Sequence, residues 1–184
     1  SASQDLTLSG LDDGPKVETG DAPTAIQLDE TSMFTANDSA LTAVSGTTQT
    51  SFTVTEGADT AAAEYTVEVG TAPSLTALID GDEYEVTLSG QGTNTLTGTA
   101  NNQTIFTVAV SDAGLVTFTM TGNGTLQHPT GGDSHNEEQA ITGLSVKCTV
   151  TDADGDVASA SQDLTLSGLD DGPKVGTGDA PAAS

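Results

Sequence analysis

The chain contains one stretch of sequence twice. Residues 1–23 read SASQDLTLSGLDDGPKVETGDAP, and residues 159–181 repeat them with a single difference, Glu18 against Gly176. The two copies lie 158 residues apart. A tandem array cut to contain one full period and an overlap has this form, whereas a self-contained globular unit has no reason to repeat its first segment. We therefore expect one repeat of a much longer protein.

The composition favours strands and turns. Hydrophobic residues make up 34% of the chain and aromatic residues 3%, so a core must come mainly from Val, Leu, Ile, Ala and the methyl groups of Thr. Thr and Val suit half-buried strands, while Gly, Asp and Asn suit turns. No segment predicts a convincing helix. Short strands separated by Gly- and Asp-rich turns predict an all-β protein, an immunoglobulin-like Greek-key β-sandwich, although the chain lacks the Cys–Trp–Cys hallmark.

Alternating apolar residues indicate where the strands lie. The clearest hairpin joins residues 104–110 to 115–120, and its inward positions predict the core side chains Phe106, Val108, Val110, Val116, Phe118 and Met120. A second hairpin is expected on either side of the Asp80-Gly81-Asp82 turn. Further strands are expected at residues 51–55, 64–69, 93–99, 141–151 and 157–168. Cys148, the only cysteine, falls on an apolar strand position and is expected to be buried.

Three segments follow from this pattern. Residues 1–24 are expected to be the closing strand and linker of the preceding repeat, residues 25–168 the sandwich module, and residues 169–184 the linker to the next repeat. The pairing of residues 1–11 stays open. They could dangle, or compete for the position that residues 161–167 should fill, even in a neighbouring molecule.

The charge excludes several partners. There are 27 Asp and Glu against 3 Lys and Arg, a formal net charge of −24. No basic patch is available for nucleic acid or for an anionic membrane surface, and no segment is apolar enough to insert into a membrane. Cations are the natural counterpart. A solvated acidic surface that keeps the chain soluble is the alternative.

The Asp152-Ala153-Asp154-Gly155-Asp156 turn is the strongest local signal. Asp152, Asp154 and Asp156 alternate around a glycine, a pattern that can wrap a hard cation such as Ca²⁺ in oxygen ligands. The pattern is not an EF-hand, because the acidic residue at the twelfth loop position and the flanking helices are missing. A plain acidic hairpin turn is the alternative.

The length of the strand that follows suggests which other acids join this turn. Residues 157–168 extend for roughly 35–40 Å, which places the turn at the end of the domain opposite the C-terminal exit. The N-terminal linker is expected to enter at the same end as the turn, with Asp12, Asp13, Asp29 and Glu30. Seven converging carboxylates would repel one another unless a cation neutralised them. Asp170 and Asp171 are expected to form an incomplete counterpart at the far end.

No constellation predicts an enzyme. The Asp80–Glu83 segment is better explained as a hairpin turn. The loop at residues 122–139 contains His128, Asp133, His135, Glu137 and Glu138, but without the spacing of a zinc site. No serine has a nucleophile-elbow context, and no glycine-rich loop lies between a strand and a helix.

The text TVTDADGDVASASQDLTLSGLDDGP resembles the closing strand and linker of repeat modules in RTX adhesins, giant bacterial adhesins exported by type I secretion. The segments IQLDET, FTVAVSDAGLVTFTM and TLQHPTGGDSHNEE are similar to landmarks of a longer class of these modules, so the resemblance covers roughly residues 12–171. It implies an immunoglobulin-like or cadherin-like sandwich, secretion without a cleaved N-terminal signal, and Ca²⁺ at the linkers between modules. The glycine–aspartate nonapeptides of the family's secretion region are absent from this sequence.

Two functions follow as hypotheses. The first is a structural extender on the bacterial cell surface, in contact with adjacent modules of its own chain, stiffened by Ca²⁺ and holding a distal binding domain for attachment and biofilm formation. The second is an adhesion module that binds a glycan or a protein through residues 122–139. The chain has no Trp and only two Tyr, so aromatic platforms for sugars are scarce.

Overall fold

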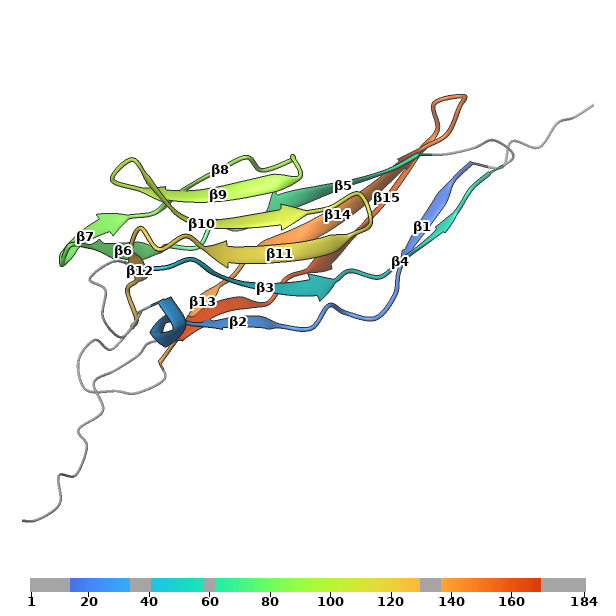
Figure 1. Ribbon diagram of the computed structural model, residues 1–184. Coiled ribbons are helices and arrows are strands. Elements are labelled where there is room, and N and C mark those ends of the chain that lie inside the picture. The colour runs from blue at the N-terminus through green and yellow to red at the C-terminus, as the bar shows by residue number, and fades with distance from the viewer. Residues whose placement is uncertain (1–13, 34–40, 58–61, 130–136, 170–184) are drawn as a thin grey trace, which may run out of the picture.

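The computed structural model describes residues 14–33, 41–57, 62–129 and 137–169 (Figure 1). These residues form sixteen β-strands and one short 3-10 turn, η1 (Glu30–Met33). The prediction of an all-β sandwich is confirmed. None of the described segments is a helix long and apolar enough to cross a membrane.

One layer of the sandwich is a five-stranded antiparallel sheet in the order β3-β11-β10-β9-β8 (Figure 1). The predicted hairpin lies at its centre, with Phe106 opposite Met120 and Val110 opposite Val116. The strands of this sheet are β3 (Val44–Gln49), β8 (Thr87–Ser89), β9 (Thr95–Ala100), β10 (Gln103–Val110) and β11 (Leu115–Met120).

Three smaller sheets complete the sandwich. The first, in the order β15-β14-β5, contains β5 (Ala62–Val69), β14 (Leu144–Thr151) and β15 (Val157–Asp163). The second, β13-β16-β2, contains β2 (Ile26–Asp29), β13 (Glu138–Ile141) and β16 (Leu166–Leu169). The third, β12-β6-β7, contains β6 (Thr76–Ile79), β7 (Asp82–Glu85) and β12 (Thr125–Leu126). The β6–β7 pair is the second predicted hairpin.

A single hydrophobic cluster fills the space between the layers. All six predicted core side chains of β10 and β11 are buried, and Phe106 meets Phe118 edge to face with ring centroids 5.9 Å apart. Aliphatic side chains supply most of the rest, including Val67, Val146 and Leu166. Cys148 is buried as predicted. Burial raises the pKa of its thiol, so at neutral pH this cysteine acts as a small apolar side chain.

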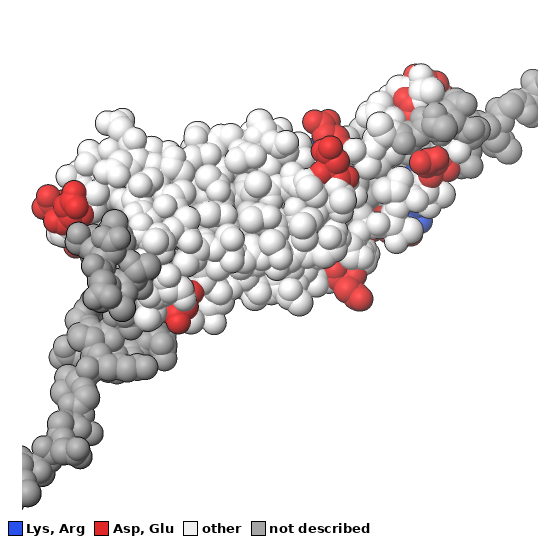
Figure 2. All heavy atoms as spheres, viewed as in Figure 1, with Lys and Arg blue, Asp and Glu red and all other residues white. Residues whose placement is uncertain are grey.

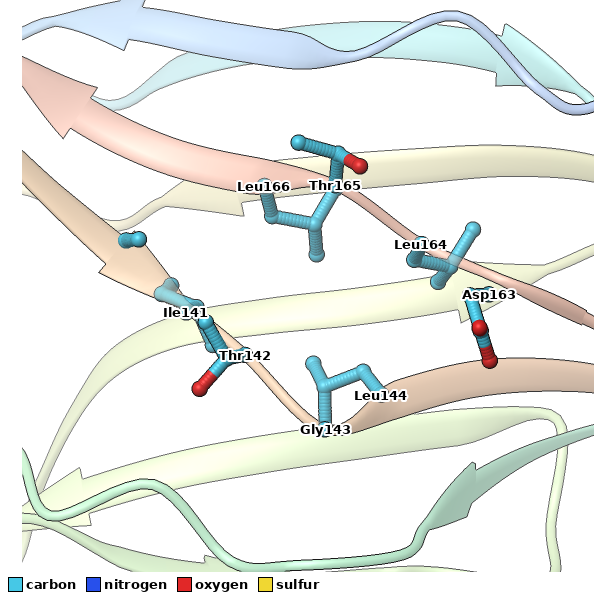
Figure 3. A pocket seen from close by; sticks show the side chains of 9 residues that line it. Ile141, Thr142, Gly143, Leu144, Asp163, Leu164, Thr165 and Leu166 are labelled. Atoms are coloured by element: carbon cyan, nitrogen blue, oxygen red, sulfur yellow. The ribbon is translucent and has the colours of Figure 1, made fainter.

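The strand expected at residues 157–168 changes sheet halfway along. β15 pairs with β14, and after Leu164 the chain passes into β16, which lies between β13 and a parallel neighbour, β2. The Leu164 amide donates to the Leu144 carbonyl at 2.9 Å where the two strand pairs diverge. Figure 3 shows the diverging segments on either side of a hollow of about 240 Å³. Apolar and threonine side chains dominate its lining, so it offers no catalytic group beyond Asp163.

Residues 14–24, expected to be linker, are held against the sandwich. β1 (Lys16–Thr19) pairs along its length with β4 (Phe52–Thr55), and this ribbon extends beyond the body of the domain alongside β15 (Figure 1). Gln162 of β15 is 6% exposed and bridges the ribbon. Its amide nitrogen donates to the carbonyls of Gly20 and Asp21 at 3.2 and 2.8 Å, and its oxygen accepts the Ser51 amide at 2.8 Å. The contacts of the sandwich therefore extend back from residue 25 to residue 14.

The described chain enters and leaves at opposite ends. At one end, a Cβ placed on Gly14 would lie 3.4 Å from the Asp156 Oδ2 atom, so the entry is beside the β14–β15 turn. At the other end, Leu169 of β16 pairs with Asp29 of β2 (Figure 1). The predicted position of the acidic turn, opposite the exit and next to the entry, is confirmed.

Candidate metal centre

The Asp152–Asp156 turn closes the β14–β15 hairpin. Thr151 pairs with Val157, and the Asp152 amide donates to the Asp156 carbonyl at 3.1 Å. Gly155 has a φ of 98°, a conformation that side chains other than glycine rarely adopt. The glycine therefore lets the hairpin close within five residues, and this closure brings the three aspartates together.

The three carboxylates of the turn lie close enough to share one cation. One oxygen each from Asp152, Asp154 and Asp156 can be chosen so that all lie within 4.8 Å of one another. Ca²⁺ binds oxygen at about 2.3–2.6 Å, so two ligands on opposite sides of the ion are about 4.6–5.2 Å apart. The donor set and its spacing fit Ca²⁺. Because Ca²⁺ takes about 6–8 oxygen ligands, the turn alone does not complete its coordination.

Asp152 also holds the turn in shape. Its Oδ1 atom accepts the amides of Gly155 and Asp156 at 3.0 and 2.8 Å. A hydrogen bond with the Asp154 side chain, and then these backbone amides, lower the pKa of Asp152 against the opposing effect of burial. Asp154 and Asp156 are exposed. The hydrogen bonds account for an acidic hairpin turn by themselves, so the geometry fits a cation without requiring one.

Asp12 and Asp13 lie outside the described residues. The described chain begins two residues after Asp12, at Gly14, beside the Asp156 carboxylate. Their connection to the turn therefore follows from chain continuity alone, and they stay predicted ligands.

Asp29 and Glu30 are not brought to the turn, so their expected convergence with Asp152 is wrong. β2 runs parallel to β16 and ends level with Leu169, at the opposite end of the module. The Asp29 Oδ1 atom accepts the Thr31 amide at 2.9 Å and so begins the η1 turn. Asp170 and Asp171 lie outside the described residues, and in the sequence they directly follow Leu169, the partner of Asp29.

Glu30 is an internal carboxylate. It is 3% exposed, and its Oε1 atom accepts the buried Leu126 amide at 3.0 Å. Its Oε2 atom lies 3.5 Å from the Nε2 atom of His128, which is also buried. Sequence reasoning missed this pair because it placed Asp29 and Glu30 together in the group of carboxylates expected beside the Asp152–Asp156 turn. The apolar alternation of Ile26 and Leu28, continued to residue 30, places Glu30 on the inward face and could have revealed it.

The remaining candidates that the structure describes form no further centre. The Asp80-Gly81 turn has positive φ at both residues, 53° and 88°, and joins β6 to β7 as the predicted hairpin. Asp133 and His135 lie outside the described residues. Among the residues that the structure describes, the Asp152–Asp154–Asp156 group is the one set of three or more metal-binding side chains close enough to hold an ion.

Fold and site together define a class: an all-β sandwich with an acidic hairpin turn at the end where the chain enters. The chain belongs to the DUF5801 family, a domain of unknown function, which matches residues 25–165. The match includes the Asp152–Asp156 turn and begins after β1. Comparisons with curated proteins and with solved structures found no match.

Proposed function

We propose that this module is an extender repeat of an adhesin on the bacterial cell surface. It holds a distal binding domain away from the cell, and Ca²⁺ at the junction between modules stiffens the array. The observation that carries the proposal is the position of the acidic turn beside the chain entry, with the exit at the opposite end of the module.

The path of the chain suits an extender. In each module the chain enters at one end and leaves at the other. An array of such modules extends in one direction, because each further module adds its own length to the array. A module with both connections at the same end would fold back on its neighbour. The acidic turn lies at the junction in this arrangement, where an ion can act on the angle between two modules.

The charge distribution also supports the proposal. Figure 2 shows a central stretch of the viewed face without charged side chains, with acidic side chains on either side of it and at both ends. Acidic side chains at the ends repel one another where modules meet, and a divalent cation relieves this repulsion. Extracellular modules bind Ca²⁺ with dissociation constants of about 10⁻⁴–10⁻³ M, so the array binds Ca²⁺ after export and stays loose inside the cell.

Calcium titration of the 184-residue chain tests the site. At a Ca²⁺ concentration ten times the dissociation constant, binding stabilises the folded state by about 1.4 kcal/mol. For a domain of this size we expect Tm to rise by about 3–6 °C. The D154N/D156N variant should lose most of this rise, because the two exposed ligands then carry no charge. Differential scanning calorimetry with Ca²⁺ or with EDTA measures both.

The D80N/D82N variant is the matched control. It removes the same number of charges from an acidic turn that closes a hairpin but gathers no third carboxylate. It should keep the full Ca²⁺-dependent rise in Tm. A Tm that does not respond to Ca²⁺ in the unmodified chain, or one that responds equally in both variants, contradicts the site.

The stiffening itself requires two consecutive modules. Small-angle scattering of a two-period chain should give a longer maximum dimension in Ca²⁺ than in EDTA, with the difference abolished by D154N/D156N in the second module. Equal dimensions in Ca²⁺ and EDTA, with Ca²⁺ bound, would leave a calcium-binding module that is not an extender.

A further inference from the structure

β1 occupies a position built by two other strands. It pairs with β4 on one side and packs beside β15. The bonds that hold its end go to the main chain: Gln162 donates to the carbonyls of Gly20 and Asp21, and the Gly20 amide donates to the Ser51 carbonyl at 2.8 Å. A segment that supplies the same backbone path can therefore fill this position.

The chain contains a second segment whose sequence nearly matches that of the β1 segment. Residues 172–181 read GPKVGTGDAP, against GPKVETGDAP at residues 14–23, so nine of ten positions agree. The position that differs lies on the exposed side of β1. Glu18 is exposed and forms a surface ion pair with Lys16 at 2.6 Å. An exposed pair of this kind contributes little to stability, so a glycine there leaves the fit intact.

The position with the strictest requirement is kept. A Cβ on Gly20 would lie 2.3 Å from the Ser51 hydroxyl oxygen, 3.0 Å from its Cβ and 3.3 Å from its carbonyl oxygen, so a branched side chain at this point must displace Ser51 of the β4 segment. The counterpart of Gly20 is Gly178. Val17, half-buried opposite Val54, has its counterpart in Val175.

We infer that residues 172–181 are a docking strand and not a flexible linker: they bind in the β1 position, between β4 and β15, of a second copy of this module. The counterpart of Lys16, the first residue of β1, is Lys174, so only residues 170–173 lie between the end of β16 and the first paired residue of the docked strand. The repeated segment that follows β16 of one module therefore supplies strand β1 of the next module. Consecutive modules are joined by a connection of four residues.

Four forms of the 184-residue chain test this inference in EDTA, so that a failure of the calcium proposal does not affect the result. Gly20→Val should expel the chain's own β1 and leave the position open to residues 172–181 of another copy. Light scattering should then show concentration-dependent species at multiples of 18.3 kDa. Unmodified chain, Gly178→Val and the G20V/G178V double variant should stay monomeric, the last because neither segment fits. A monomeric, folded G20V, or equal association of G20V and the double variant, overturns the inference.

A second measurement leaves β1 intact. Val54→Cys is placed in the otherwise unmodified chain, and a synthetic peptide of residues 172–181 with Val175→Cys is added in a glutathione buffer. The register sets this cysteine opposite position 54, so opening of β1 should allow a disulfide to trap the peptide. The same peptide with Gly178→Val should be trapped at least several-fold less. Equal trapping of the two peptides contradicts the inference even where G20V fails to fold.

Discussion

Glu30 illustrates how the surroundings of one side chain depend on where its strand ends. Its carboxylate meets the Leu126 amide, which has lost contact with water. Two adjacent acids in a sequence look alike, but here Asp29 faces solvent and begins a turn while Glu30 points inward. The site residues of the Asp152 turn were predictable because their spacing is local. The inward face of Glu30 could be read from the alternation of Ile26 and Leu28, but the end of the module at which it lies could not, because that depends on β2 lying parallel to β16.

We expect Glu30→Ala to lower the free energy of unfolding by about 1–3 kcal/mol, since it leaves the buried Leu126 amide without its acceptor. Glu30→Gln keeps an oxygen in place and should cost less. Urea denaturation measures both. Glu83→Ala, at an exposed carboxylate that accepts a hydrogen bond from Gln127, is the control and should change stability by less than about 0.5 kcal/mol. Equal losses in the Ala and Gln variants at position 30 would show that the hydrogen bond is not the cause.

Asp152 predicts a dependence of stability on pH. Its pKa is lower in the folded state, so its contribution is fully present above the pKa of the unfolded carboxyl, about 3.9. The contribution is lost as pH falls through the lower pKa of the folded state. Asp152→Asn keeps an oxygen acceptor but does not titrate. The stability difference between the two proteins in EDTA should therefore shrink from pH 6 to pH 3, and a constant difference would contradict the assigned cause.

At the scale of elements, strands with strict alternation were predictable and strands defined by their partners were not. β10 and β11 could be predicted because each has three apolar residues at alternate, inward positions. β15 and β16 read as one strand because the alternation continues through Leu164 and Leu166, although the pairing partner changes between them. β1 has one apolar residue, Val17, between Pro15 and Gly20, so its text reads as linker. Its hydrogen bonds come from β4 and Gln162, which lie far along the sequence.

The bridge made by Gln162 should decide whether β1 stays docked. Gln162→Ala removes the acceptor of the Ser51 amide and two donors, at an expected cost of about 1–3 kcal/mol. Hydrogen exchange should quicken for the amides of β1 and β4 and stay unchanged for β10 and β11, because the opening is local. Gln91→Ala, in an exposed turn, is the control. Faster exchange throughout the domain would show that Gln162 supports the whole fold and not this ribbon.

At the scale of the whole molecule, the family match and the folded unit have different bounds. The match covers residues 25–165, whereas the described contacts run from Gly14 beside Asp156 to Leu169 paired with Asp29. The first copy of the repeated sequence contains β1 of this module, and the second copy begins within β15 and contains β16. Gln162, in the second copy, therefore hydrogen-bonds to Gly20 and Asp21 in the first.

The parallel pairing of β2 with β16 has a mechanical consequence. When the two ends of the module are pulled apart, β2 is held through the chain entry and β16 is pulled towards the exit. Because the two strands are parallel, this force acts along them as shear. The register from Ile26–Leu166 to Asp29–Leu169 then bears the tension on all its hydrogen bonds together, instead of opening them one after another. β1 and β4 lie along the same axis (Figure 1) and meet the pull in the same way. In the extender that we propose, this direction of the strands would resist tension along the array.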